Sequence, residues 1–222
     1  MNLDYVELDI WLSKDNKVVV VHGCQGKVLD ANGQEKQITE MSVEELKKIS
    51  LNEKNDLIPT LDEILRLCKN KIKINIEMKG DQKDLPYETL KLVQKYQMLD
   101  QVYFSSFFHQ FNDLIKEAII KLNIEQKIKF AYLFSNQQQF PDINNLEEGN
   151  QLNFSSLLIY NQKARKLFKQ AQNKNVKLCC YFGYDVLENY GVYKDLLDIG
   201  VQSIITNQPF TILSFRKNIF KN

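Results

Sequence analysis

Strand-like and helix-like segments alternate along the whole 222-residue chain, and this alternation constrains the fold more than any other feature. Short runs rich in valine, isoleucine and leucine predict the strands. The predicted strands are residues 4–10, 17–21, 72–78, 101–105, 128–133, 154–158, 176–182 and 201–206. Parallel neighbours need a crossover connection, which is usually a helix, so the pattern predicts an α/β fold with a parallel sheet.

The predicted helices have recognisable starts and apolar stripes. Ser42 with Glu45 matches the capping box, and so does Thr60 with Glu63. Apolar residues at helical spacing predict two further helices, one with Phe111, Leu114, Ile115, Ala118, Ile119 and Leu122, the other with Ala164, Leu167, Phe168 and Ala171. Residues 23–59 hold no predicted core strand or long helix, and we interpret them as an insertion beside the site.

Composition and charge exclude several classes of protein. With 44% hydrophobic and 26% charged residues the chain is typical of a globular domain. Its net charge of +1 supplies no field to gather nucleic acid, so we expect no nucleic-acid partner. The apolar runs are far shorter than the roughly 20 residues of a membrane-spanning helix. We therefore expect no stable membrane insertion and, because no leader-like segment follows Met1, a cytoplasmic location.

Two architectures fit the alternation: an open doubly wound sheet and a closed (β/α)8 barrel. No glycine-rich phosphate-binding fingerprint follows any predicted strand. This removes the main argument for a dinucleotide-binding or P-loop fold.

Two predicted strands carry polar side chains on one face. Successive side chains of a strand point to opposite faces, so residues at odd positions share a face. In residues 5–12 and 72–79 the even positions are apolar, and the odd positions hold Glu7, Asp9, Asn75, Glu77 and Lys79. Packed under helices, the apolar faces would leave the polar faces toward a barrel lumen, with the acids at the carboxyl ends of the strands. The alternative is a solvent-facing position on edge strands.

Three carboxylates in one place repel one another unless a cation lies between them. A hard cation, Mg²⁺ or Ca²⁺, is the natural occupant of an all-oxygen site of this kind. His22 follows the valine run 18–21 directly, which predicts a place at the mouth of the same sheet. Imidazole exchanges protons near neutral pH, so His22 is a candidate general acid or base, the alternative being a histidine that caps a strand end. We interpret His109, at the predicted start of a helix, as structural.

Six short motifs occur in the order and spacing of one known family. They are Glu-x-Asp at 7–9, the valine run into His22, Ile-Pro-Thr-Leu at 58–61, Asn-Ile-Glu-Met-Lys at 75–79, Phe-Ser-Ser-Phe at 104–107 and Ile-Ile-Thr-Asn-Gln-Pro at 204–209. Each alone is weak, but the first four together are highly specific. The chain resembles the glycerophosphodiester phosphodiesterases across nearly its whole length.

The resemblance implies a (β/α)8 barrel that hydrolyses glycerophosphodiesters, such as glycerophosphocholine, to glycerol 3-phosphate and an alcohol with the help of Ca²⁺ or Mg²⁺. It implies that Glu7, Asp9 and Glu77 are the metal ligands. It gives His22 a catalytic role and places Lys79 near the phosphate, where its charge could stabilise developing negative charge. Tyr181 stands where the family usually has a tryptophan at a strand end, and is the candidate there for binding substrate.

The start of the sequence departs from the family. The family's barrel opens with a strand that ends in His-Arg and is followed by Glu-Asn, and neither has a counterpart here. We therefore expect residues 1–222 to form one phosphodiesterase domain without its first β/α unit, since a complete barrel takes about 250 residues. The alternatives are a truncated or degenerate barrel that binds metal and phosphodiester without turnover, and a phospholipid lyase that forms a cyclic phosphate. The oligomeric state is left open.

Overall fold

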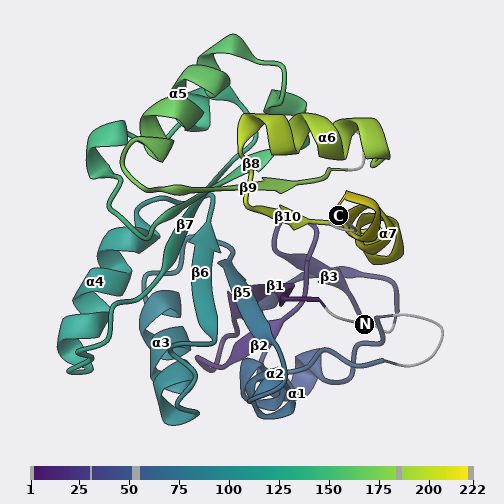
Figure 1. The fold of residues 1–222 in the computed structure, drawn as a ribbon. Helices are drawn as coiled ribbons and strands as arrows, with labels where there is room; N and C mark the ends of the chain where they lie inside the picture. The colour runs from purple at the N-terminus through teal and green to yellow at the C-terminus, as the bar shows by residue number, and fades with distance from the viewer. Residues whose placement is uncertain (1–2, 31, 52–55, 184–186, 220–222) are drawn as a thin grey trace. The chain divides into compact units, whose positions relative to one another are not determined.

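The computed structural model describes residues 3–30, 32–51, 56–183 and 187–219 (Figure 1). By its internal contacts the chain divides into two compact units, Met1–Ile128 and Lys129–Asn222. In both units strands and helices follow one another along the chain, as the sequence predicts. None of the described helices has the length and apolar character required to span a bilayer.

In the described part of the first unit, the strands of the main sheet follow the order β2-β1-β5-β6. Their bounds are β1 Tyr5–Leu12, β2 Val18–Val20, β5 Lys73–Met78 and β6 Val102–Ser106. The strands β1, β5 and β6 are parallel. The helices of this part are α2 (Leu61–Cys68), α3 (Leu85–Lys95) and α4 (Phe111–Lys121), with α3 in contact with both of the others (Figure 1).

Strand β2 is antiparallel to β1, so the prediction of parallel pairing throughout is wrong at this point. Only residues 13–17 separate the two strands, which is too short for the helical crossover that parallel strands require. The turn is held by the backbone N–H of Ser13, which donates to the Lys17 carbonyl at 2.9 Å. Asn16 in this turn has a φ of 56°, a conformation that asparagine tolerates better than most residues.

Residues 23–59 contain a small two-stranded sheet and short helices in their described part, in agreement with the prediction that no core strand or long helix occurs there. The elements are β3 (Lys27–Leu29), β4 (Glu35–Gln37), the 3₁₀ turn η1 (Ile38–Glu40) and α1 (Val43–Leu46). Their apolar side chains form one buried cluster with the β1–β2 hairpin, made of Trp11, Val19, Val28, Ile38, Leu46, Ile49 and Ile58. This part of the segment is therefore packed on the strands that carry the acids.

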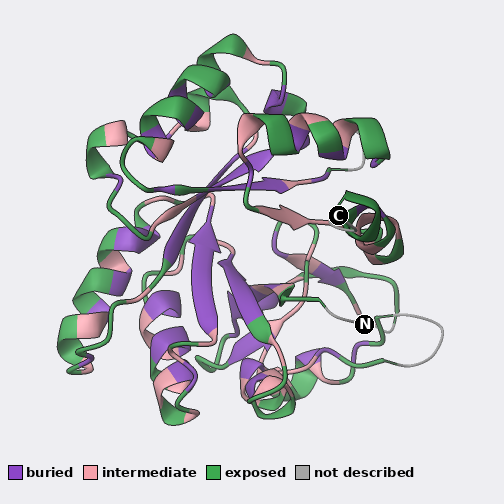
Figure 2. Cartoon of the chain, in the orientation of Figure 1, coloured by how far each residue is buried: buried purple, intermediate pink, exposed green. Residues whose placement is uncertain are grey.

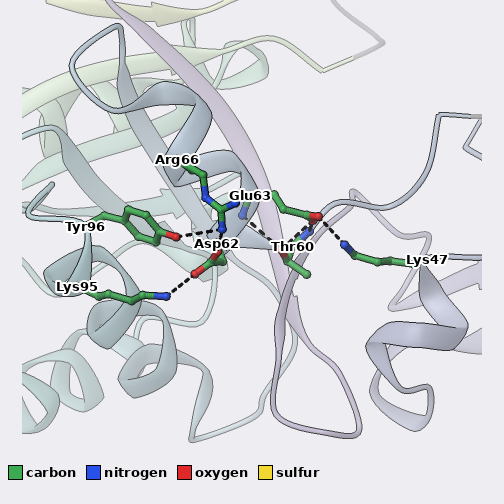
Figure 3. Close-up of polar contacts among 7 residues, drawn as sticks. All are labelled: Lys47, Thr60, Asp62, Glu63, Arg66, Lys95 and Tyr96. Atoms are coloured by element: carbon green, nitrogen blue, oxygen red, sulfur yellow. Dashed lines mark hydrogen bonds and ion pairs between the residues drawn. The ribbon is translucent and has the colours of Figure 1, made fainter.

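Both predicted capping boxes are present. Ser42 caps α1 and Thr60 caps α2, each with its glutamate three residues later. Glu63 of the second box also accepts a hydrogen bond from Lys47 Nζ at 2.5 Å, which links α1 to α2 (Figure 3). The hydrogen bonds from Lys47 and Thr60 lower the pKa of Glu63 to about 2.

Asp62 extends this surface network to α3 (Figure 3). Its carboxylate accepts from Lys95 Nζ at 2.8 Å and from Arg66 at 2.6 Å. These donors, with Lys95 contributing most, lower the pKa of Asp62 to about 2. The network therefore carries its full charge at neutral pH and joins three helices of the first unit.

Among its described residues the second unit has the parallel strands β7 (Phe130–Phe134), β8 (Gln151–Ser155), β9 (Lys177–Tyr181) and β10 (Ser203–Ile205), in that order. Its helices are α5 (Gln162–Gln172), α6 (Tyr190–Ile199) and α7 (Pro209–Ile219), and its 3₁₀ turns are η2 (Gln137–Gln139), η3 (Ile143–Asn145) and η4 (Ser156–Leu158). Strand β8 ends at Ser155, so the strand predicted at residues 154–158 lies three residues too late. The Ser155 hydroxyl accepts from the Leu157 N–H and starts η4 instead.

Helices of both units carry buried positions on one face (Figure 2). Of the six apolar residues predicted for the α4 stripe, Phe111, Ile115 and Ala118 are buried and the other three are half-buried. In α5 the four predicted residues are all buried, namely Ala164, Leu167, Phe168 and Ala171. The Phe168 ring lies 4.2 Å from the Phe154 ring of β8, so this face of β8 packs on α5.

Candidate functional site

Three carboxylates come together on neighbouring strands of the first unit. Asp9 of β1 lies directly opposite Glu77 of β5 in the parallel register, and Glu7, opposite Asn75, lies two residues before Asp9 on the same face. One carboxylate oxygen from each of these residues lies within 4.8 Å of the others. The alternation in the sequence predicted this convergence, because odd positions on two adjacent parallel strands share a face.

The acids of β1 do not lie at the carboxyl end of their strand, contrary to the prediction. Glu7 and Asp9 are the third and fifth of the eight residues of β1. The strand continues beyond Asp9 because residues 10–12 pair with β2 in the hairpin. Glu77, by contrast, is the last residue but one of β5.

Lys79 follows β5 and closes the cluster with a positive charge. Its Nζ lies 3.1 Å from Asp9 Oδ1 and forms a second ion pair with Glu77. The same Nζ lies 5.6 Å from the centroid of the Phe107 ring, a cation–π contact. The backbone N–H of Lys79 donates to the Ile10 carbonyl at 3.0 Å, which fixes the base of the side chain beside β1.

Burial disfavours the charged forms of Glu7, Glu77 and Lys79. Burial, reinforced by the charges of Asp9 and Glu77 and opposed by Lys79, raises the pKa of Glu7 to about 8. Burial likewise raises the pKa of Glu77 against the opposing charge of Lys79. Burial alone would lower the pKa of Lys79, but Glu77 and Asp9 outweigh it and the pKa is raised. One ammonium group therefore faces three carboxyl groups, and the site favours additional positive charge.

The donor set fits a hard divalent cation. Glu7 Oε1 is buried and has no hydrogen-bond partner among the described residues. A buried carboxylate oxygen without a partner is costly, and coordination to a cation would satisfy it. All three groups offer oxygen, the ligand atom that Ca²⁺ and Mg²⁺ prefer.

A buried polar pair lies beside the acids. Ser105 Oγ donates to Asn75 Oδ1 at 2.8 Å, and both residues are fully buried. In the strand register Asn75 is opposite Glu7 and Ser105 is opposite Glu77. The sequence analysis included both residues in motifs but gave them no role, although their place on the polar face of their strands was the available signal.

Trp11 packs around the turn that carries Lys79. Gly80 has a φ of 75°, and a Cβ at this position would lie 2.9 Å from the Trp11 ring. The indole N–H of Trp11 donates to the His22 carbonyl at 3.3 Å. Trp11 thus packs against the backbone after Lys79 and holds the backbone at His22, a role that its sequence position alone did not indicate.

His22 lies two residues after β2 and is exposed. The backbone N–H of the preceding residue, Val21, donates to the Asp9 carbonyl at 3.1 Å. The chain at His22 is therefore attached to the strand that supplies two of the three acids, and its side chain is open to solvent. His109 lies in the turn between β6 and α4.

The family model for the "Glycerophosphoryl diester phosphodiesterase family" matches residues 1–211. The chain belongs to this family. "Putative glycerophosphodiester phosphodiesterase YhdW" of Bacillus subtilis is 34% identical over 87 residues, which are 36% of this chain and 35% of that protein. "Glycerophosphodiester phosphodiesterase" of Caldanaerobacter subterraneus subsp. tengcongensis is 32% identical over 121 residues, which are 49% of this chain and 48% of that protein. The matched segments thus span about a third and about half of the length of these curated relatives.

Solved structures of glycerophosphodiester phosphodiesterases have a fold similar to that of this chain. The crystal structure of a "putative glycerophosphodiester phosphodiesterase" from Galdieria sulphuraria matches with a TM-score of 0.79 and 23% identity, covering 96% of this chain and 85% of that chain. At this identity the likeness shows the fold. The predicted α/β class, with the (β/α)8 architecture of this phosphodiesterase family, is confirmed.

Tyr181, the predicted substrate-binding residue, lies in the second unit of this phosphodiesterase. It is the last residue of β9 and is half-buried. Its hydroxyl donates to the Phe134 carbonyl of β7 at 3.2 Å, so the side chain reaches past β8 to the carboxyl end of the next strand but one. Its binding of substrate stays a prediction.

Proposed function

We propose that this chain hydrolyses glycerophosphodiesters to glycerol 3-phosphate and an alcohol, with one divalent cation, Ca²⁺ or Mg²⁺, held by Glu7, Asp9 and Glu77. The observation that supports it is the cluster of three carboxylates with an ammonium group directly beside it. Such a pair of sites offers a phosphodiester two positive charges at neighbouring positions. Family membership makes a glycerophosphodiester the substrate class to test first.

Each residue of the site has a role that follows from its chemistry. Lys79 binds a non-bridging phosphate oxygen through its ammonium group and stabilises negative charge there. The cation supplies a second positive charge that polarises the phosphoryl group. His22 accepts or donates one proton, and Tyr181 contacts the glycerol or head group. General acid–base hydrolysis uses two proton-transferring groups, and His22 fills one of these roles.

The charge of the chain favours small substrates over a bilayer. A net charge of +1 gives little attraction to an anionic membrane surface. We therefore expect soluble diesters such as glycerophosphocholine to be hydrolysed faster than intact phospholipid, in a cytoplasmic route of glycerophospholipid breakdown.

The test is release of glycerol 3-phosphate from glycerophosphocholine. Activity should require Ca²⁺ or Mg²⁺, disappear in EDTA, and fall at least about 100-fold in Glu7→Ala and His22→Ala. Glu125→Gln is the matched control, because Glu125 is an exposed acid in a loop of the same unit. Activity that persists in EDTA would refute the metal-dependent reaction.

The products separate the alternatives. Phosphorus NMR distinguishes a monoester, expected from hydrolysis, from a cyclic phosphate, expected from a lyase. Calorimetric binding of cation or glycerophosphocholine without any product over long incubation would instead show a binding module, and would refute the proposed activity while keeping the site.

A further inference from the structure

We propose that Lys79 and the divalent cation compete for the same carboxylates, so that cation binding transfers the Lys79 ammonium group from the acids to the substrate phosphate. This rests on the proposed function, because it takes the three carboxylates as the cation site. It adds an order of events: the lysine becomes a phosphate ligand as a consequence of cation binding.

The competition follows from the contacts of Lys79. Its Nζ pairs with Asp9 and with Glu77, which are two of the three groups that would hold the cation. Like charges a few ångströms apart in a partly buried site repel strongly, because the effective dielectric constant there is well below that of water. A cation on these oxygens and an ammonium group on the same oxygens therefore exclude one another.

The side chain is built so that its tip can move while its base stays in place. The backbone of Lys79 is held by its hydrogen bond to Ile10 and by the packing of Gly80 against Trp11. The Lys79 side chain is 20% exposed, against 11% for Asp9 and 9% for Glu77, so it is the most solvent-accessible of the three. A lysine side chain is a flexible four-carbon stem, and a movement of its tip needs no backbone change.

The face of Phe107 gives the displaced ammonium group a favourable neighbour. The Phe107 ring centroid lies 5.6 Å from Nζ, within the range of cation–π attraction. The charge can therefore leave the carboxylates without entering a wholly apolar environment. An arriving phosphate then supplies the charge-assisted hydrogen bonds that the carboxylates have given up.

The sign of the coupling between the two ligands follows. Cation binding breaks the ion pairs of Lys79, and phosphate binding gives the released lysine a new partner. Each ligand thus removes part of the cost of binding the other, so cation and phosphate bind with positive cooperativity, and this coupling is reciprocal. If Lys79 served only to bind phosphate, with no competition, removing it would leave the cation affinity unchanged.

Isothermal titration calorimetry of the whole chain with Ca²⁺ and with Mg²⁺ tests this. Lys79→Met should bind the cation at least about tenfold more tightly than wild type in the absence of phosphate, because the competitor is removed. Inorganic phosphate, used as the probe, should tighten cation binding in wild type at least about tenfold more than in Lys79→Met. Lys71→Met removes an exposed lysine of the same unit and should resemble wild type.

The outcomes are distinct. Equal or weaker cation binding by Lys79→Met, or an equal effect of phosphate in both proteins, would overturn the competition while leaving the cation site intact. Absence of cation binding by wild type would overturn the site of the proposed function and the competition together. Circular dichroism checks that the variant is folded, and Lys79→Gln, which removes the charge but keeps a polar side chain, provides the same comparison if Lys79→Met does not fold.

Discussion

Replacement of Glu7 by glutamine should stabilise the cation-free protein at alkaline pH while abolishing its stabilisation by cation. Glu7 is raised in pKa from 4.5 to about 8, chiefly by burial and then by the charges of Asp9 and Glu77. The folded chain therefore holds a proton on Glu7 that the unfolded chain has released between these pH values. Stability conferred by this group is lost as pH rises, because the unfolded state binds fewer protons in that window.

The magnitude comes from the size of the shift. A shift from 4.5 to about 8 is roughly 3.5 pH units, and at about 1.4 kcal/mol per unit it corresponds to about 5 kcal/mol. Partial solvent access to the carboxyl group reduces this, so we expect about 2–4 kcal/mol. Glutamine is close to the protonated glutamate in shape and stays neutral. Glu7→Gln should thus match wild type near pH 5 and exceed its free energy of unfolding by that amount near pH 8.5.

Urea unfolding in EDTA at pH 5, 7 and 8.5 measures the difference between the two proteins. Ca²⁺ or Mg²⁺ at about 1,000 times its Kd should remove or reverse this difference at pH 8.5, since a ligand at that concentration adds about 4.1 kcal/mol to wild type alone. Glu125→Gln, at an exposed loop position, should follow wild type throughout. A wild-type minus Glu7→Gln difference that does not change between pH 5 and 8.5 in EDTA would refute the argument.

Three further predictions concern stability and are read by urea unfolding. Gly80→Ala should destabilise the chain by about 1–3 kcal/mol, because the added Cβ would meet Trp11 at 2.9 Å in a backbone with a φ of 75°; an unchanged midpoint would show that this packing is not tight. Phe168→Ala should cost about 3–5 kcal/mol, since it empties the space against Phe154, and a loss below 1 kcal/mol would mean that α5 closes over the gap. Glu63, with its pKa lowered to about 2, contributes stability that is present above pH 4.5 and is lost as pH falls toward 2. Solvent screening keeps this below about 1 kcal/mol, and a wild-type advantage over Glu63→Gln that persists at pH 2 would contradict it.

The sequence was sufficient to predict the meeting of the acids because a strand has a fixed period of two. In parallel neighbouring strands, residues that share a face and a register position lie side by side. Asp9 of β1 and Glu77 of β5 are such a pair. The capping boxes were equally predictable, because they depend on residues within one turn. The correct predictions are therefore those that depend on residues within one turn or on the fixed period of a strand.

The incorrect parts depend on contacts between segments. Residues 13–17 form a tight turn. A connection this short indicates a hairpin and not a helical crossover, but the prediction of parallel pairing followed the general alternation of strands and helices. The boundary of β8 was misplaced because the apolar run continues past Ser155, whereas its hydroxyl begins a 3₁₀ turn there. The support that Trp11 gives to Gly80 and His22 arises only when β1, β2 and the end of β5 are assembled.

The hairpin that the sequence analysis missed has a consequence for the chemistry of the acids. Because β1 continues to Leu12 as one arm of that hairpin, Glu7 and Asp9 are recessed within the strand instead of lying at its exposed end. This position within the strand buries the carboxyl groups, and burial is the main cause of the raised pKa of Glu7. A cluster on an exposed strand end would be hydrated and would need no counter-charge. The hairpin and the Trp11 cluster packed on it thus help to turn a row of strand acids into a site that favours a cation.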